Sequence, residues 1–411
     1  MRPATFSSSA SFLGVEASER VERVTPLELF FDLVFVFAIT QVTTLLAAEP
    51  TWGGLLRGLI VLAALWWAWA AYAWLTNTLN PEEGLVRIAM FVVMAAMLIA
   101  ALAVPEAFGD HGVIFGVAYL VVRAMHLALY ALAARGDHDL LGAVLRMTPS
   151  STISGVLILG AGFLEGNERT ALWVIALAID YLGVLVGRGQ GWRLSPGHFS
   201  ERHGLIVIIA IGESIVALGV AATGTPLTAG VITTALVGMT IATALWWTYF
   251  DWFSIVVEHR LRQATGAQQA TLARDAYSYL HFVMVAGIVL FAMSLKKALG
   301  HYDDHLDVVP AAALCAGLGA YLLAHVLLRL RISGSIGHGR PVALAALLVF
   351  WPFADDVPAL AALSVAATIF VLLIAYEAIR YRESRSFIRH GEVPTAELLL
   401  QTGSAPRRSP S

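Results

Sequence analysis

The segment LELFFDLVFVFAITQVTT, residues 27–44, has the composition of a membrane-spanning helix with two carboxylates near its start. Glu28 and Asp32 are four residues apart, so on a helix both side chains lie on one face. A charged side chain at the centre of a bilayer costs about 2.5–3.5 kcal/mol, so such groups usually face protein or water. We interpret the two acids as a proton- or cation-accepting pair. The structural alternative is that Glu28 caps the helix start and Asp32 bonds a neighbouring helix.

The composition of the whole chain indicates a polytopic membrane protein. Of its 411 residues, 58% are hydrophobic and 13% are charged, whereas a soluble chain has about 25% charged residues. The net charge of −3 and the lack of a basic tract do not indicate nucleic-acid binding. Cys315 is the single cysteine, which excludes a disulfide framework. Residues 1–26 lack the apolar core of a signal peptide, so we expect a cytoplasmic tail there.

Windows of about 20 apolar residues predict an all-α transmembrane bundle of about twelve spans. The predicted spans are residues 27–47, 55–77, 85–104, 112–134, 149–164, 170–187, 202–221, 228–252, 277–298, 308–330, 341–354 and 358–379. The fifth and eleventh are short, so each is interpreted as a tilted span, a re-entrant segment or a broken helix. Prolines, Pro149 and Pro341 among them, fall near the predicted span boundaries.

The distribution of basic residues predicts the orientation of these spans. With the N-terminus inside, most of the 26 Lys and Arg residues fall on cytoplasmic loops and tails. The outer loops carry only Arg57, Arg169, Lys296 and Lys297. By the positive-inside rule we therefore expect both termini in the cytoplasm.

Two short matches suggest an internal repeat. ALWW occurs at 64–67 and 244–247, and AYL at 118–120 and 320–322, each time in predicted spans that are six apart. This spacing predicts a parallel 6+6 duplication, although short matches also arise by chance in a chain so rich in Ala, Leu and Trp. The predicted parts are the N-terminal tail 1–26, a first six-span half 27–187, a cytoplasmic linker 188–200, a second half 201–380 and the C-terminal tail 381–411.

Four more ionisable residues lie at the start of the seventh predicted span or within it. Glu201 and Arg202 open the span at the predicted cytoplasmic face, followed by His203. An interfacial Glu201–Arg202 salt bridge is the structural interpretation of the first two. Glu213 lies about twelve residues deeper, roughly 18 Å along a helix, where a carboxylate must be paired or neutral. We interpret Glu213 as the central proton or ion site.

Arg123 and Asp180 each lie near the middle of a predicted span. Arg123 needs a carboxylate partner at this depth, and Asp180 and Glu213 are the two candidates. The pair is interpreted either as architectural or as one that changes partners between states. Because the deep acids Asp32, Asp180 and Glu213 outnumber Arg123, protons or cations are favoured over anions.

Three histidines lie within predicted spans and are candidate proton relays or ordinary hydrogen-bonding groups. They are His126, one turn after Arg123, His281 and His325.

The loop HYDDHLD (301–307) matches no zinc or EF-hand spacing, and GHGRP (337–341) lacks the length and the Lys-Ser/Thr of a phosphate loop. We expect no metal and no cofactor.

Several stretches resemble one bacterial family. The most specific are TPLELFFDLVFVFAITQVT (25–43) and HFSERHGLIVIIAIGESIVALG (198–219). Weaker matches occur in the same order, at AYAWLTNTLNPE (71–82), RIAMFVVMAAML (87–98), VPEAFGD (104–110) and ALWWTYFD (244–251). Together they resemble the low temperature requirement A (LtrA) family. The resemblance implies a multi-span bacterial inner-membrane protein linked by name to growth in the cold, and it brings no reaction, substrate or catalytic residue.

The main functional hypothesis is a proton- or cation-linked secondary transporter for an unidentified small molecule. Glu213 would be the central site, Glu28 and Asp32 the cytoplasmic gate, and the partners would be the lipid bilayer and protons or small cations. A proton or cation channel lined by the same acids is the first alternative, and a non-transporting protein needed in the cold is the second. An enzyme is not expected, because no HExxH, GxSxG or Cys–His set occurs. The oligomeric state is not determined by these patterns.

Overall fold

The structure is a computed structural model that describes residues 23–187 and 189–382. The rest of the two predicted tails, 1–22 and 383–411, lies outside the described residues, as does residue 188. Within the described ranges the regular elements are helices, and eleven of them are long and apolar enough to cross a membrane. The predicted all-α class is confirmed, and the chain is a multi-pass membrane protein.

The chain folds into two compact units, which are described separately. Of the described residues, the first unit contains 23–38, Ala63–Arg202 and Thr265–Thr271. The second contains Ile39–Leu62, His203–Ala264 and residues 272–382. Helices α1 (Pro26–Ala48), α2 (Trp52–Leu75), α7 (Pro196–Ala222) and α10 (Gly266–Ala273) therefore contribute residues to both units. The six-span halves expected from the sequence stay a prediction.

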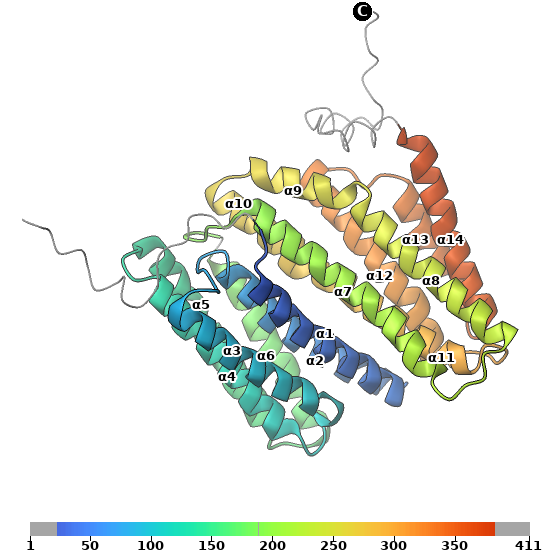
Figure 1. Cartoon of the computed structure of the whole chain (residues 1–411), viewed down its shortest axis with the longest axis horizontal. Coiled ribbons are helices and arrows are strands. Elements are labelled where there is room, and N and C mark those ends of the chain that lie inside the picture. The colour runs from blue at the N-terminus through green and yellow to red at the C-terminus, as the bar shows by residue number, and fades with distance from the viewer. Residues whose placement is uncertain (1–22, 188, 383–411) are drawn as a thin grey trace, which may run out of the picture. The chain divides into compact units, whose positions relative to one another are not determined.

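The first unit is built around four helices that pack in chain order. α3 packs against α4, α4 against α5, and α5 against α6 (Figure 1). The helices with residues in this unit are α1 (Pro26–Ala48), α2 (Trp52–Leu75), α3 (Gly84–Ala103), α4 (Gly112–Ala133), α5 (His138–Ala161), α6 (Gly166–Val186), α7 (Pro196–Ala222) and α10 (Gly266–Ala273). Large apolar side chains of α3, such as Ile88 and Leu102, are exposed. Such a surface suits contact with lipid.

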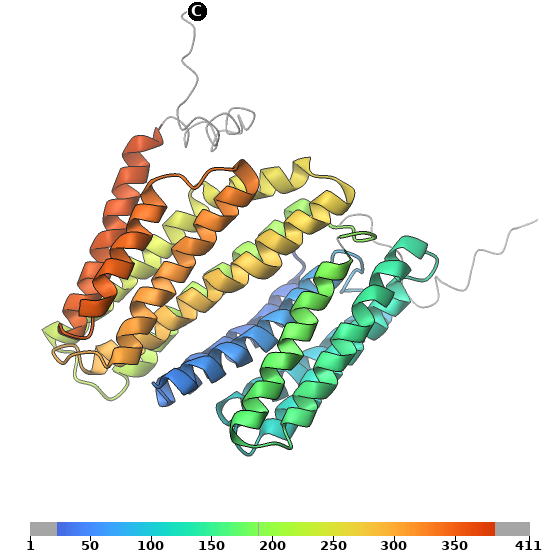
Figure 2. The ribbon, with the colours of Figure 1, turned by 180° about the vertical axis from the view of Figure 1, so that it is seen from behind.

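The second unit has its tightest packing between α11 and α12, which run side by side in both ribbon views (Figure 2). A Cβ atom on Gly287 of α11 would meet the backbone carbonyl of Gly317 on α12, and a Cβ on Gly317 would meet that of Gly287. Glycine at both positions therefore lets the two helix backbones approach closely.

The further helices of this unit are α8 (Ala229–Phe250), α9 (Phe253–Gln263), α10 (Gly266–Ala273), the π-helical turn Arg274–Leu280, α11 (His281–Gly300), α12 (Val308–Ser333), α13 (Gly339–Phe350) and α14 (Ala359–Arg380).

The fifth predicted span begins too late in the sequence. α5 starts at His138, eleven residues before the predicted start, and Pro149 lies inside it rather than at a boundary. The Asp137 side chain caps the helix by accepting from the backbone amides of Asp139 and Leu140. Proline removes the hydrogen bond to the carbonyl four residues earlier, and membrane helices tolerate such a loss inside a packed bundle.

The eleventh predicted span is a short helix. α13 has 12 residues, which correspond to about 18 Å of helix. It continues only into the 3-10 turn Trp351–Phe353. A bilayer core of about 30 Å is longer than this helix, so α13 does not join the eleven helices that are long enough to cross.

Candidate functional site: a buried charge network in the first unit

Arg202 holds two carboxylates at once. Its Nη1 donates to Glu28 Oε1 across 2.7 Å, and its Nη2 donates to Asp32 Oδ1 across 2.7 Å. All three side chains are buried. The predicted facing of Glu28 and Asp32 is therefore realised, with one guanidinium between them.

The two acids are positioned by the first turns of α1. Glu28 accepts hydrogen bonds from the backbone N–H and the hydroxyl of Thr25, across 2.9 and 3.1 Å. The backbone N–H of Glu28 donates back to the Thr25 hydroxyl, which makes a reciprocal capping arrangement. Asp32 follows one turn later on the same face. The capping role weighed for Glu28 and its charge contact with Arg202 thus occur together.

Side chains of α2 and α7 complete the network. Trp69 Nε1 donates to Asp32 Oδ1 across 2.8 Å, and His198 Nε2 lies 3.0 Å from Glu28 Oε2. The Arg202 guanidinium also donates to the Thr76 hydroxyl across 3.2 Å. It lies 5.7 Å from the Trp69 ring, where the ring face attracts a cation.

The network has an uneven charge balance. Two carboxylates share one guanidinium, so one negative charge is left over when the His198 imidazole is neutral. Asp32 Oδ2 is buried and has no hydrogen-bond partner among the described residues. A buried charged oxygen without a partner is costly. A proton, a small cation or a water molecule at Asp32 Oδ2 would remove that cost.

The prediction of a salt bridge between Glu201 and Arg202 is wrong. Glu201 is exposed and accepts a hydrogen bond from the Val24 backbone N–H across 3.2 Å. Successive residues on a helix point about 100° apart and do not face each other. Arg202 therefore points to the acids of α1 instead.

Arg123 and Asp180 form a second contact in the first unit, as one of the two weighed pairings predicted. Arg123 Nη2 lies 3.1 and 2.9 Å from the two Asp180 oxygens and donates to the Ser151 hydroxyl across 2.6 Å. The three residues come from α4, α6 and α5, and all are buried. His126 does not join this pair, because its Nε2 faces the Ala71 carbonyl at 3.1 Å.

The predicted residues Glu213 and His203 belong to the second unit. Glu213 Oε2 accepts a hydrogen bond from the Thr40 hydroxyl across 2.5 Å, and its side chain is 2% exposed. His203 lies beside the rings of Tyr277 and His281, with centroid distances of 4.9 and 5.5 Å. The structure thus divides the predicted site residues among several separate contacts.

Sequence reasoning missed three members of the Arg202 network as site residues. Trp69 lies just after the ALWW stretch among several other aromatic residues, and nothing in its spacing indicates that its indole donates to Asp32. His198 opens the second specific family stretch, and that position was its only signal. Thr76 carried no signal, because a threonine within an apolar helix commonly bonds its own backbone.

The comparisons with known proteins cover most of these residues. The family described as bacterial low temperature requirement A protein (LtrA) matches residues 23–375. The uncharacterized protein RA0937 of Rhizobium meliloti (strain 1021) is 32% identical over 297 residues, which cover 67% of this chain and 69% of that protein. No solved structure matches the chain significantly. The match spans both units and the whole charge network, and the chain belongs to the bacterial low temperature requirement A (LtrA) family.

Proposed function

We propose that the protein is a proton- or cation-linked secondary transporter of the bacterial inner membrane, and not an enzyme. The observation that carries the proposal is the network of Glu28, Asp32 and Arg202, in which two buried carboxylates share one guanidinium. Asp32 Oδ2, the buried oxygen without a partner among the described residues, is the proposed position for the proton or cation.

The charge imbalance supports a binding role over a purely architectural one. Arg123 and Asp180 pair one to one, which suffices to compensate two buried charges. At Arg202 a second carboxylate shares the same guanidinium, and His198 beside Glu28 adds a positive charge only when its imidazole is protonated. An ionisable group that stays in a membrane helix at such a cost is a functional candidate.

The same contacts suggest how ion binding is coupled to a conformational change. When Asp32 is protonated, its attraction to Arg202 weakens and Glu28 remains as the only charged partner of the guanidinium. The start of α7, which carries Arg202, is then held less tightly to α1. In this proposal the ion shifts a two-state equilibrium by binding one state better than the other.

Glu213 is proposed as a second proton or ion site. Its carboxylate accepts from Thr40 in the second unit, and the ion pairs among the described residues do not include it. In the same proposal Arg123 and Asp180 change partners between states. Neither role depends on knowing the transported small molecule.

The proposal is tested with the full chain reconstituted into liposomes on a solid-supported membrane. A step from alkaline to neutral pH should displace charge transiently as protons bind, and Asp32→Asn should reduce this signal at least severalfold. Arg193→Gln serves as the control, because Arg193 is 76% exposed. The same recording with a step in Na⁺ or K⁺ concentration tests a metal cation in place of the proton.

The outcomes separate the alternatives. A signal that saturates and is lost in Asp32→Asn supports a carrier with its ion site at this network. A steady current that follows the applied voltage would assign a channel instead. A wild-type protein without any ion-dependent signal, or one whose signal is unchanged in Asp32→Asn and in Glu213→Gln, would overturn the proposal.

A further inference from the structure

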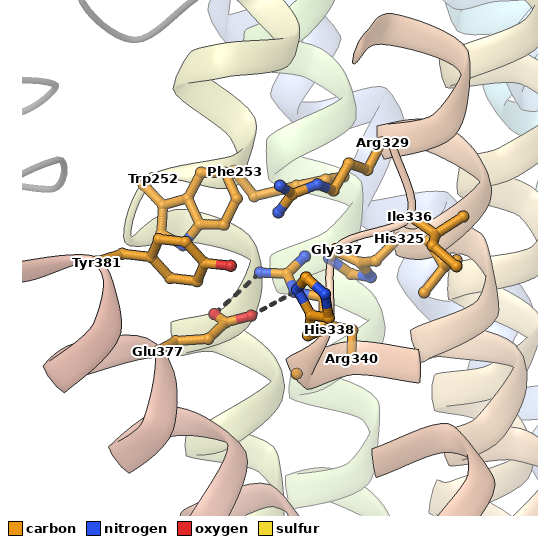
Figure 3. Close-up of a pocket in the computed structure, with 12 residues that line it drawn as sticks. Trp252, Phe253, His325, Arg329, Ile336, Gly337, His338, Arg340, Glu377 and Tyr381 are labelled. Atoms are coloured by element: carbon orange, nitrogen blue, oxygen red, sulfur yellow. Dashed lines mark hydrogen bonds and ion pairs between the residues drawn. The ribbon is translucent and has the colours of Figure 1, made fainter. Parts of the chain in front are cut away.

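A pocket in the second unit gathers charged groups that the proposed function does not use. It lies where α12 ends, α13 begins and α14 ends, and Figure 3 shows its side chains. The charged residues that line it are Arg329, Arg340 and Glu377. Its enclosed volume is about 10 Å³, which is room for about one water molecule. A ligand therefore places a single oxygen in the enclosed part, and the rest of the ligand stays outside.

Two of the three charges neutralise each other. Arg340 Nε lies 2.9 Å and Nη2 3.3 Å from the two Glu377 oxygens (Figure 3). Nη2 also donates to the Thr248 carbonyl across 2.9 Å. The guanidinium lies 5.2 Å from the Trp252 ring and 4.9 Å from the Phe253 ring. Arg340 is thus fixed as part of the wall.

Arg329 leaves the pocket with a net positive charge. None of the ion pairs among the described residues includes Arg329, and its Nε is buried without a hydrogen-bond partner there. Gly337, with φ of +69°, lies so close that a Cβ atom on it would be 3.0 Å from the Arg329 guanidinium carbon. The backbone of the 334–339 loop therefore holds this cation at the pocket.

His325 adds a hydrogen-bond acceptor to the same pocket. It lies one turn before Arg329 on α12, so both side chains share one face. Its Nδ1 is 2.9 Å from the Tyr321 carbonyl, and a carbonyl only accepts, so Nδ1 carries the proton. In the neutral ring Nε2 is then an acceptor. This Nε2 belongs to a fully buried side chain and has no partner among the described residues.

The start of α13 supplies further donors. The first backbone N–H groups of a helix have no partner within the helix and attract anions. α13 is 12 residues long and begins at Gly339, which lines the pocket. Its available donors are at most the N–H groups of Gly339 and Arg340, because Pro341 has no N–H and the Val342 N–H donates to the His338 carbonyl. The GHGRP stretch is no phosphate loop by its spacing, yet its backbone places a helix N-terminus beside Arg329.

We propose that this pocket binds the phosphate group of a phosphate monoester. The ligand needs one O–H that enters the enclosed part and donates to His325 Nε2, together with oxygens at the pocket mouth that accept from Arg329 and from the N–H groups at the start of α13. A singly protonated phosphate has both, and its second ionisation lies near pH 6. Sulfate and phosphodiesters have no such proton near neutral pH. The proposal does not rest on the transport function.

The experiment uses the purified full chain in detergent, titrated calorimetrically with inorganic phosphate and with sulfate at about pH 6, where phosphate monoesters keep much of their proton. Phosphate should bind at least tenfold more tightly than sulfate. Arg329→Gln and His325→Phe should each weaken phosphate binding at least tenfold. The matched control is Arg331→Gln on the same helix, because Arg331 is exposed and pairs with Asp275.

A lipid arm identifies the source of the phosphate. Nanodiscs containing phosphatidic acid, a monoester, are compared with nanodiscs containing phosphatidylglycerol, a diester, and the retained lipid is counted by native mass spectrometry. Retention of phosphatidic acid that depends on Arg329 assigns a lipid headgroup, and binding of inorganic phosphate alone assigns a soluble ligand. Equal affinity for phosphate and sulfate, or binding that is unchanged in a folded Arg329→Gln protein, would overturn the proposal in both forms.

Discussion

Arg202 Nη2 donates to Asp32 Oδ1 across 2.7 Å, between two buried residues that are 170 positions apart in the chain. This contact joins the first turns of α1 to the start of α7. Because both side chains are buried, water and salt screen their charges much less than at the surface. Substituting Arg202 and substituting Asp32 should therefore have different consequences.

Removal of the cation should be strongly destabilising. Arg202→Gln leaves Glu28 and Asp32 buried without their shared partner, which by analogy with buried ion pairs costs about 3–5 kcal/mol. We expect a clear drop in the thermal unfolding midpoint, measured by tryptophan fluorescence of the purified protein. The exposed Arg193→Gln variant should keep the wild-type midpoint. Equal midpoints for both variants would contradict a charge role for Arg202.

Removal of the excess negative charge at Asp32 should leave stability intact and abolish ion binding. Asn at position 32 keeps an oxygen that accepts from Arg202 and Trp69, and it matches the shape of Asp. The unfolding midpoint of Asp32→Asn should therefore equal or exceed that of the wild type, while ion-dependent charge displacement is lost. A variant that loses stability as much as Arg202→Gln would show that both carboxylates are structural.

The contact between Arg123 and Asp180 is suited to a double-mutant cycle. Arg123→Gln leaves a buried carboxylate unpaired and should cost about 3–5 kcal/mol. Adding Asp180→Asn removes that carboxylate's charge, so the double variant should be more stable than Arg123→Gln alone. The expected coupling energy is about 0.5–3 kcal/mol. Additive effects in denaturant unfolding would mean that the two side chains do not interact.

The close crossing of α11 and α12 predicts a steric effect. A methyl group at Gly287 meets the Gly317 backbone, so Gly287→Ala must separate the two helices and should cost about 1–3 kcal/mol. Gly212→Ala on α7 is the matched control, because a Cβ there has no described atom within 4 Å. Alanine also has the higher helix propensity, so the control should be neutral or stabilising. Thermal unfolding in detergent compares the two, and a harmless Gly287→Ala would contradict the crossing.

The helical class and most of the spans follow from the amino-acid sequence alone, because hydrophobic length is a local property of about 20 residues. The sequence also places Glu28 and Asp32 on one face, since helical spacing fixes that relation within one element. The same reasoning failed at Pro149, because α5 continues through a residue type that usually ends a helix. It also counted residues 341–354 among the predicted spans, although the helix there, α13, has only 12 residues.

Which charged side chains meet follows from the packing of the helices and not from their spacing in the sequence. Arg202 faces the acids of α1 rather than its neighbour Glu201, and Arg340, expected in a cytoplasmic loop, is buried against Glu377. Arg329 and His325 gained significance only when the start of α13 was placed beside them. A side chain's partner depends on which helices pack together, and periodicity along the chain specifies the face of a helix without specifying the helix that covers it.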